Sequence, residues 1–130
     1  MKKTSHFFIL YDVKIMKTKI YYNPRCSKCR IGLKILKEKN EDIEIIKYLE
    51  EAPTKEDLKK ILEILKIPAI DLIRQNEDIY KKLVKKNDKP NENQVIEWMI
   101  KHPKIIQRPI VIKNKKAIIG RPPEKILEIL

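Results

Sequence analysis

Two cysteines three residues apart, set between a strand pattern and a helix pattern, constrain this sequence most. Lys17–Tyr22 is rich in residues that favour strands and ends at the turn signal Asn23-Pro24. Cys26-Ser27-Lys28-Cys29 follows at once, and a helical pattern then continues to about Asn40. At a helix N-terminus, unpaired backbone N–H groups stabilise an anion and lower the pKa of a thiol. We therefore expect Cys26 to be a reactive nucleophile.

The remaining strands and helices follow the order of an α/β domain. Asp42–Lys47 is predicted to be a second strand, so the chain opens with a βαβ unit. A hairpin is expected from Ile110–Ile112 and Lys116–Ile119, and Gly120 ends its second strand. A final helix is expected over Glu124–Leu130, after two prolines.

The segment between the second and third strands is helical in pattern. Thr54 is expected to cap a helix whose apolar residues repeat until Pro68. Three shorter helices are predicted after Pro68, over Ala69–Arg74, Glu77–Val84 and Gln94–His102. Asn91 is expected to cap the last of them, and Pro103 is expected to end it. The whole order is that of a thioredoxin-like α/β fold with a helical insertion between strands 2 and 3.

Length and hydropathy favour one cytoplasmic domain. The 130 residues suit a single domain, which we place at residues 16–130, after an N-terminal extension at residues 1–15 that we expect to be poorly ordered. No apolar run approaches the roughly 18 residues needed to cross a bilayer. His6–Tyr11 is too short for a signal peptide and has no small-residue cleavage site. We expect neither membrane insertion nor secretion.

The net charge of +12 does not by itself indicate nucleic-acid binding. Lysines account for 25 of the 30 basic residues and are spread along the whole chain, whereas an electrostatic footprint should be clustered. We expect no nucleic-acid partner, and a small lysine-coated monomer.

Arginine is informative against this background, because its guanidinium donates two parallel hydrogen bonds to an oxyanion. The five arginines are Arg25, Arg30, Arg74, Arg108 and Arg121.

The cysteine pair allows other interpretations. One is that both cysteines are buried and unreactive. Such cysteines are less common at a turn as strongly cationic as this one, which carries Arg25, Lys28 and Arg30. A zinc site needs four ligands, and the two histidines lie far apart in the sequence, so we expect no metal. A structural disulfide of a secreted protein fits poorly with the absence of a signal peptide.

The Arg108-Pro109 peptide bond precedes a predicted strand, and for this bond cis and trans are equally expected.

Four motifs together resemble the glutaredoxin-linked arsenate reductases, over roughly residues 17–130. The motifs stand in the right order and at matching separations, which makes the resemblance specific. They are Asn23-Pro24-Arg25-Cys26-Ser27-Lys28-Cys29-Arg30, Ile73-Arg74-Gln75-Asn76, Gln107-Arg108-Pro109-Ile110-Val111 and Gly120-Arg121-Pro122.

The resemblance implies that Cys26 is the catalytic cysteine and that Arg74, Arg108 and Arg121 surround an arsenate oxyanion. Arg25, Arg30 and Pro109 would support the site. Arsenate would be reduced to arsenite through a cysteinyl-arsenate adduct. The external reductant would be glutathione with glutaredoxin, and no cofactor would be held by the protein.

Two positions depart from the family pattern. Tyr22 stands where the family often has a histidine that supports the thiolate, so Arg25 or the helix terminus would have to compensate. Cys29 stands where many members have serine. It is a candidate resolving thiol, and a Cys26–Cys29 disulfide would make thioredoxin a reductant instead of, or beside, glutathione and glutaredoxin.

Two alternative functions share these motifs. Spx-type transcription regulators have the same fold, use the C-x-x-C pair as a redox switch and bind RNA polymerase. They keep equivalents of Arg74 and Arg108-Pro109 but typically lack the Arg121-Pro122 motif, which is present here. The other alternative is a thiol-disulfide reductase of this fold without arsenate activity.

Overall fold

The computed structural model describes residues 17–130, and the extension expected at residues 1–15 lies outside them. One mixed sheet has the strand order β2-β1-β3-β4. β1 runs parallel to β2 and antiparallel to β3, and β3 is antiparallel to β4. The strands are β1 (Thr18–Tyr21), β2 (Ile43–Ile46), β3 (Ile110–Lys113) and β4 (Lys116–Ile119).

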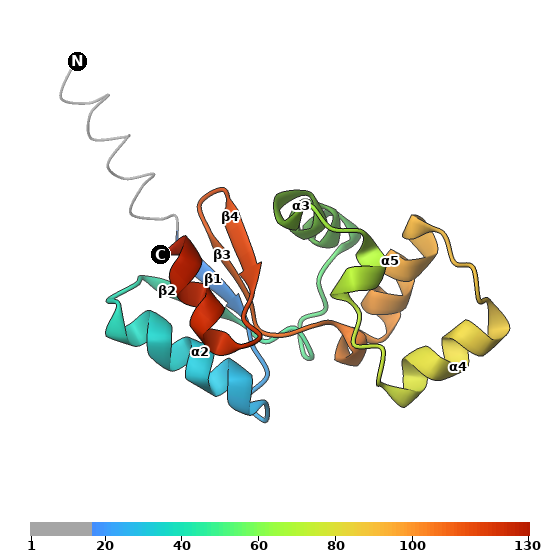
Figure 1. Cartoon of the computed structure of the whole chain (residues 1–130), viewed down its shortest axis with the longest axis horizontal. Coiled ribbons are helices and arrows are strands. Elements are labelled where there is room, and N and C mark those ends of the chain that lie inside the picture. The colour runs from blue at the N-terminus through green and yellow to red at the C-terminus, as the bar shows by residue number, and fades with distance from the viewer. Residues whose placement is uncertain (1–16) are drawn as a thin grey trace, which may run out of the picture.

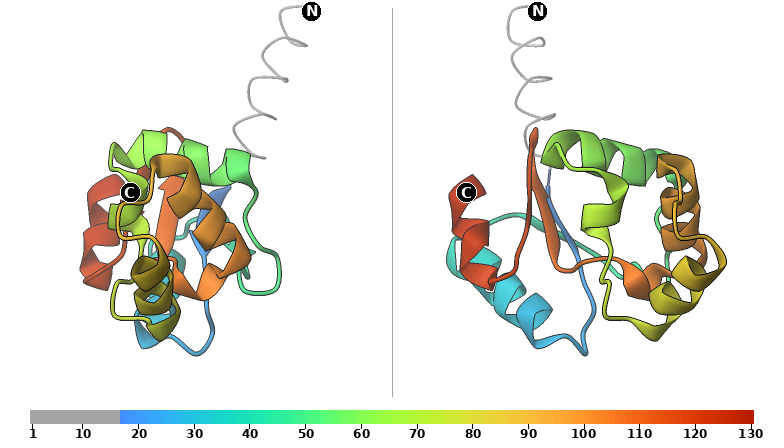
Figure 2. Two further views of the ribbon diagram at one scale, coloured as in Figure 1. Left: turned by 90° about the vertical axis from the view of Figure 1, so that its right-hand side faces the viewer. Right: turned by 45° about the vertical axis from the view of Figure 1, so that its right-hand side comes forward.

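Helices cover both faces of this sheet (Figures 1 and 2). On one face lie α2 (Ser27–Glu38) and the C-terminal 3₁₀ helix η3 (Pro123–Ile129), and α3 (Lys55–Leu65) lies on the other. Neighbouring strand residues point to opposite faces, so Ile20 packs with Leu36 and Ile126 while Tyr21 packs with Leu58. The sheet thus separates two hydrophobic cores.

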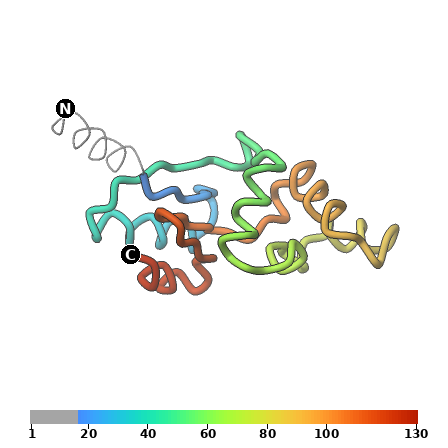
Figure 3. Tube along the Cα trace, turned by 90° about the horizontal axis from the view of Figure 1, so that it is seen from above, coloured from blue at the N-terminus to red at the C-terminus, as the bar shows by residue number. Residues whose placement is uncertain are grey.

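The helical insertion begins with α3 and extends the molecule at one end (Figure 3). It continues through η1 (Ala69–Leu72), α4 (Asp78–Lys86), α5 (Glu92–Lys101) and η2 (Pro103–Ile105). Both predicted caps are present as capping boxes. The Asp57 N–H donates to Thr54 Oγ1 at 3.1 Å, and the Gln94 N–H donates to Asn91 Oδ1 at 2.9 Å.

Several predicted boundaries were wrong. The helix expected over Ala69–Arg74 is a short 3₁₀ segment that ends at Leu72, and α4 starts one residue after Glu77, which is its N-cap. The final helix is 3₁₀ and starts at Pro123. Arg108-Pro109 is cis, and so is Arg121-Pro122, which was not predicted.

Strand register brings distant parts of the chain to one end of the sheet. Tyr21 pairs with Ile46 and with Ile110, and Ile110 pairs with Ile119. The residues that follow β1, β2 and β4 therefore meet those that precede β3. These are the segments that carry Cys26, Tyr48, Arg121 and Arg108.

Candidate active site

Cys26 is the N-cap residue of α2 and is partly exposed. A tight turn places Cys26 at the start of α2. The Cys26 N–H donates to the Asn23 carbonyl at 3.0 Å, and the Arg25 N–H donates to Asn23 Oδ1 at 3.0 Å. Asn23 itself is 8% exposed, so the turn is anchored in the protein body. Cys26 therefore lies beside the free N–H groups of the first turn of α2.

The pKa of Cys26 falls from 9.0 to about 7. Burial acts in the opposite direction, but hydrogen bonds outweigh it. They come from the Cys29 N–H, the Cys29 thiol, the Arg108 guanidinium and the Lys28 N–H. A substantial fraction of Cys26 is therefore thiolate at neutral pH, which is the nucleophilic form.

Cys29 has the opposite character. It is fully buried, and burial raises the pKa of its thiol to about 12. The neighbouring Cys26 raises that pKa further, while the Asn23 N–H and Arg108 oppose the rise. At neutral pH, Cys29 is a neutral thiol that donates to the ionised Cys26. The two cysteines are in contact but differ in protonation.

Arg108 is the buried cation of the site, with 9% of its surface exposed. Its Nη1 donates to the Lys104 carbonyl at 3.0 Å, and its guanidinium also contacts Cys26. Arg108 Nε is buried without a hydrogen-bond partner among residues 17–130. A buried guanidinium without a counterion is costly, so Arg108 is suited to pair with an anion that enters the site.

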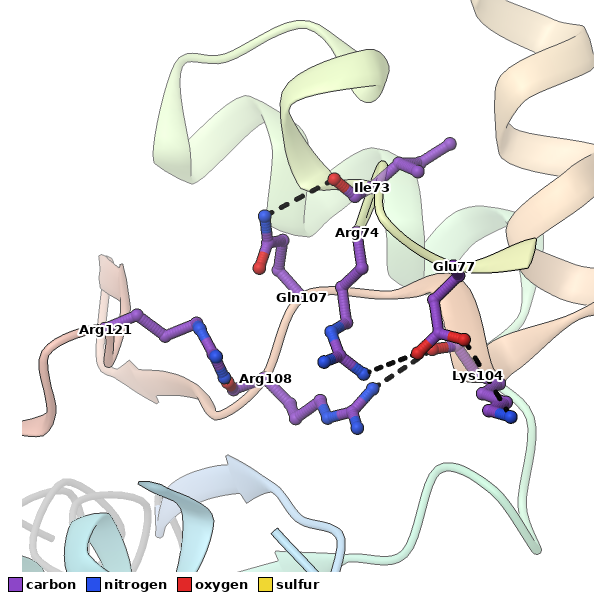
Figure 4. A network of polar contacts seen from close by, with 7 residues as sticks. All are labelled: Ile73, Arg74, Glu77, Lys104, Gln107, Arg108 and Arg121. Atoms are coloured by element: carbon purple, nitrogen blue, oxygen red, sulfur yellow. Dashed lines mark hydrogen bonds and ion pairs between the residues drawn. The ribbon is translucent and has the colours of Figure 1, made fainter. Parts of the chain in front are cut away.

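Arg74 and Arg121 lie on either side of Arg108 (Figure 4). The Arg121 Nη1 donates to the Arg108 carbonyl at 2.9 Å. The Arg74 Nη1 lies 2.8 Å from Glu77 Oε1, and the Arg74 side chain points towards the Arg108 guanidinium in Figure 4. Arg74 and Arg121 also line one pocket of about 510 Å³, together with Gln107.

The insertion and the sheet are joined directly at this place. An isolated bridge pairs Ile73 with Ile106, and the Arg74 N–H donates to the Ile105 carbonyl at 2.7 Å. The Gln107 N–H donates to the Leu72 carbonyl at 2.8 Å. The backbone that carries Arg74 is thereby tied to the segment that leads into Arg108.

The other predicted residues have different surroundings. Arg30 Nη1 donates to the Pro24 carbonyl at 2.8 Å, and the Arg25 side chain is exposed beside a second pocket. Neither arginine is among the groups that lower the pKa of Cys26. Pro109 packs between α2 and β4, and its ring lies near both glycines of the chain. Arg25 and Arg30 thus shape the turn and its surroundings, and Arg108 contacts the sulfur.

Sequence reasoning missed three residues around the arginines. Glu77 contacts both Arg74 and Lys104, whose Nζ lies 3.8 Å from Glu77 Oε2. The sequence holds no helical signal for this pair, because Arg74 and Glu77 both precede α4. Tyr48 is fully buried, its hydroxyl has no hydrogen-bond partner in the described chain, and burial raises its pKa to about 12. Only the tertiary packing places Tyr48 in the electrostatic field of Arg108 and the cysteines.

This arrangement suits attack by a thiolate on an anionic, oxygen-rich centre. An ionised sulfur stands beside one buried guanidinium, and two more guanidinium groups lie within the same network. Among residues 17–130, no three His, Cys, Asp or Glu side chains are grouped so that they could hold a metal ion. Within the same range, no helix is long and apolar enough to span a bilayer.

Comparison with known proteins identifies the family of the chain. A model of the ArsC family matches residues 21–129. The chain is 45% identical over 115 residues to the uncharacterised protein YfgD of Escherichia coli K12, which covers 88% of this chain and 97% of that protein. It is 38% identical over 113 residues to an arsenate reductase of Neisseria meningitidis, or 86% of this chain and 97% of the relative.

A solved structure gives the same result for the fold. The arsenate reductase from Vibrio cholerae superimposes with a TM-score of 0.84 at 40% identity, over 88% of this chain and 98% of the other. The four-stranded mixed sheet with its helical insertion is thus confirmed as the thioredoxin-like α/β fold of these proteins. The family match spans nearly all of the described residues, and the chain belongs to the ArsC family.

Proposed function

We propose that this protein is an arsenate reductase that uses Cys26 as its nucleophile. The observation that carries the proposal is the position of the Cys26 sulfur, at a helix N-terminus and in contact with the buried Arg108. Relatives described as arsenate reductases, at 34–38% identity over most of the chain, support the choice of oxyanion.

Electrostatics explains why such an enzyme needs several arginines. Arsenate is an anion at neutral pH, and the attacking thiolate is also negative. Their repulsion has to be offset before the sulfur can approach arsenic. Arg108 stands next to the sulfur, and Arg74 and Arg121 line the adjoining pocket, where guanidinium groups can hold oxygen atoms in a fixed geometry.

The reaction has two steps. In the first, Cys26 Sγ forms a bond to arsenic and one arsenate oxygen leaves as water, after taking up protons. In the second, another thiol attacks Cys26 Sγ. The electron pair of the sulfur–arsenic bond stays on arsenic, which leaves as arsenite, and the two sulfurs form a disulfide. Arsenic gains two electrons and the two thiols lose two.

The second thiol is either Cys29 or an external one. Cys29 contacts Cys26 and would give a Cys26–Cys29 disulfide, which thioredoxin would reduce. Its pKa of about 12 means that it must lose its proton as it attacks. An external glutathione would give a mixed disulfide at Cys26, which glutaredoxin would remove.

The cysteine pair also supports a second candidate function. A nucleophilic Cys26 in contact with Cys29 is sufficient for thiol–disulfide exchange without any oxyanion. That activity would not require Arg121, which reaches into the pocket rather than to either sulfur. Arsenate dependence and sensitivity to Arg121 therefore distinguish the two functions.

Arsenate-dependent oxidation of NADPH tests the proposal. The assay is run in parallel with glutathione, glutaredoxin and glutathione reductase, and with thioredoxin and thioredoxin reductase. We expect activity with at least one system, none with Cys26→Ser, and about 10- to 100-fold lower kcat/KM with Arg121→Lys. Loss of activity in Cys29→Ser with the thioredoxin system alone would identify Cys29 as the resolving thiol. No arsenate-dependent oxidation, together with Cys26-dependent oxidation of NADPH when a small disulfide such as hydroxyethyl disulfide replaces arsenate as the oxidant, would favour the thiol–disulfide reductase.

A further inference from the structure

The three arginines of the site are held in two different ways. Arg108 Nη1 donates to the Lys104 carbonyl at 3.0 Å, and Arg121 Nη1 donates to the Arg108 carbonyl at 2.9 Å. Arg74 Nη1 donates instead to a carboxylate oxygen, Glu77 Oε1, at 2.8 Å. A carbonyl fixes a guanidinium and leaves its charge, whereas a carboxylate fixes it more strongly and offsets part of that charge. Arg74 is thus the arginine whose position and charge both depend on another side chain.

Glu77 is built into the turn that carries Arg74. The Glu77 N–H donates to the Arg74 carbonyl at 3.1 Å, so that backbone and side chain both link the two residues. Glu77 is also the N-cap residue of α4, but within residues 17–130 its side chain makes no capping hydrogen bond. The carboxylate is directed at Arg74 rather than at the free N–H groups of its own helix (Figure 4).

Burial favours the contact with Arg74 over the other contact of Glu77. The Arg74 and Glu77 side chains are 27% and 17% exposed, and their charged atoms lie 2.8 Å apart. Lys104 Nζ lies 3.8 Å from Glu77 Oε2, and the lysine side chain is 64% exposed. A long ion pair with an exposed partner contributes little. The principal partner of Glu77 is therefore Arg74.

We propose that Glu77 is a positioning residue of the oxyanion site, which holds the Arg74 guanidinium in place before the oxyanion arrives. This inference rests on the proposed function, which requires an oxyanion that Arg74 binds. A guanidinium has five N–H donors, and Glu77 engages Nη1, so that other donors remain for the oxygen atoms of the ligand. An arginine that is fixed in advance loses less conformational freedom on binding. This gain outweighs the repulsion between the Glu77 carboxylate and the anion.

Protection of Cys26 by arsenate tests this role without turnover. Cys29→Ser is the parent protein and no external thiol is added, so that no second thiol can complete the reaction. The rate at which iodoacetamide alkylates Cys26 is followed by mass spectrometry at increasing arsenate concentration and constant ionic strength. Arsenate that occupies the site or bonds to Cys26 slows the alkylation. The concentration that gives half of the maximal protection is the apparent dissociation constant.

Glu77→Ala should raise this constant about fivefold or more, because Arg74 is no longer held in place. Glu77→Gln keeps an acceptor oxygen without the charge, so it should bind arsenate more tightly than Glu77→Ala. Glu97→Ala, which removes an exposed glutamate from α5, is the matched control and should change the constant by less than about twofold.

The variant Arg74→Met shows whether Glu77 acts through Arg74. Arg74→Met should itself bind arsenate more weakly than the parent. In that background, Glu77→Ala should change the constant by less than about twofold, since no guanidinium is left to position. Equal weakening by Glu77→Ala with and without Arg74 would overturn the inference. Tighter binding in Glu77→Ala would also overturn it, because Glu77 would then be a competitor of the oxyanion for Arg74.

Failure of the inference and failure of the proposed function give different results. Protection of the parent by arsenate, with equal constants in Glu77→Ala and Glu97→Ala, would overturn only the role of Glu77. A parent protein that arsenate does not protect would contradict the oxyanion site of the proposed function itself, and the role of Glu77 with it.

Discussion

Individual residues at this site differ in protonation because their surroundings differ within a few ångströms. Cys26 lies at the free end of α2, where N–H groups and Arg108 stabilise its charge. Cys29 lies one turn further into the helix, where burial penalises the charge. The same spacing that makes the pair a redox motif also makes one cysteine a hydrogen-bond donor to the other.

Removal of the Cys29 thiol should raise the pKa of Cys26. Cys29→Ala deletes a donor to the thiolate, whereas Cys29→Ser keeps a hydroxyl at the same place and serves as the matched control. In wild type, the rate of alkylation by iodoacetamide should fall as the pH drops through about 7, because the thiolate is protonated. We expect the midpoint to move towards 9 in Cys29→Ala and much less in Cys29→Ser. An unchanged midpoint in Cys29→Ala would contradict this role.

Tyr48 gives a second test at this scale. Its hydroxyl is buried with no partner in the described chain. Removal of an unsatisfied buried polar group relieves a desolvation cost, so Tyr48→Phe should be neutral or stabilising by about 1 kcal/mol. Denaturant unfolding measures this. A loss of stability above about 1 kcal/mol would show that the hydroxyl is satisfied in solution.

Single residues also mark the limit of sequence reasoning. Cys26 could be predicted because its signal is local: a turn, a thiol and a helix start stand next to one another. Arg74, Arg108 and Arg121 come from separate segments, and their proximity depends on strand register and on the bridge between Ile73 and Ile106. Tyr48 carries no local signal, since a tyrosine after a strand is ordinary.

The elements of the fold meet closely around Pro109. A Cβ atom added at Gly120 would lie 2.9 Å from Pro109 Cγ and 3.0 Å from Ile126 Cδ1. At Gly32 it would lie 2.9 Å from Ile126 Cδ1 and 3.3 Å from Pro109 Cγ. Both glycines therefore allow β4, α2 and η3 to approach the segment that carries Arg108.

The two glycines should differ in their tolerance of alanine. Gly120→Ala places a methyl against a rigid proline ring and should destabilise the protein by about 1–3 kcal/mol. Gly32→Ala meets mainly the flexible end of Ile126 and gains about 1 kcal/mol of helix propensity, so its net effect should be smaller. Thermal or denaturant unfolding compares them. A larger loss for Gly32→Ala would contradict this account of the packing.

At the scale of elements, sequence signals succeeded where they were chemical and short-range. The capping residues Thr54 and Asn91 mark helix starts because their side chains bond to N–H groups three residues away. The distinction between 3₁₀ and α geometry in η1 and η3 was not predictable. Those segments are only four and seven residues long, and packing against neighbouring elements decides their form.

The larger of the two hydrophobic cores crosses from one face of the sheet into the insertion. Tyr21 and Ile110 of the sheet share a cluster with Leu58 of α3 and Met99 of α5. The insertion is thus packed as part of the same body, although it extends to one end (Figure 3). Arg74, which it contributes, is positioned through this core.

Unfolding should accordingly be a single transition. Trp98, the one tryptophan of the chain, reports on α5, and far-UV circular dichroism reports on all elements. We expect coincident denaturant midpoints from both signals, in wild type and in Met99→Ala, which should lose about 2–5 kcal/mol. A Trp98 transition at lower denaturant would mean that the insertion unfolds separately.

The proposed reaction changes the oxidation state of arsenic at Cys26. The most direct measurement separates arsenate from arsenite by chromatography with elemental detection, after incubation with each complete reductant system. We predict arsenite in clear excess over the protein-free reaction for wild type with at least one system, and none in excess for Cys26→Ser. Equal arsenite from wild type and Cys26→Ser, or no arsenite with either system, would contradict the claim.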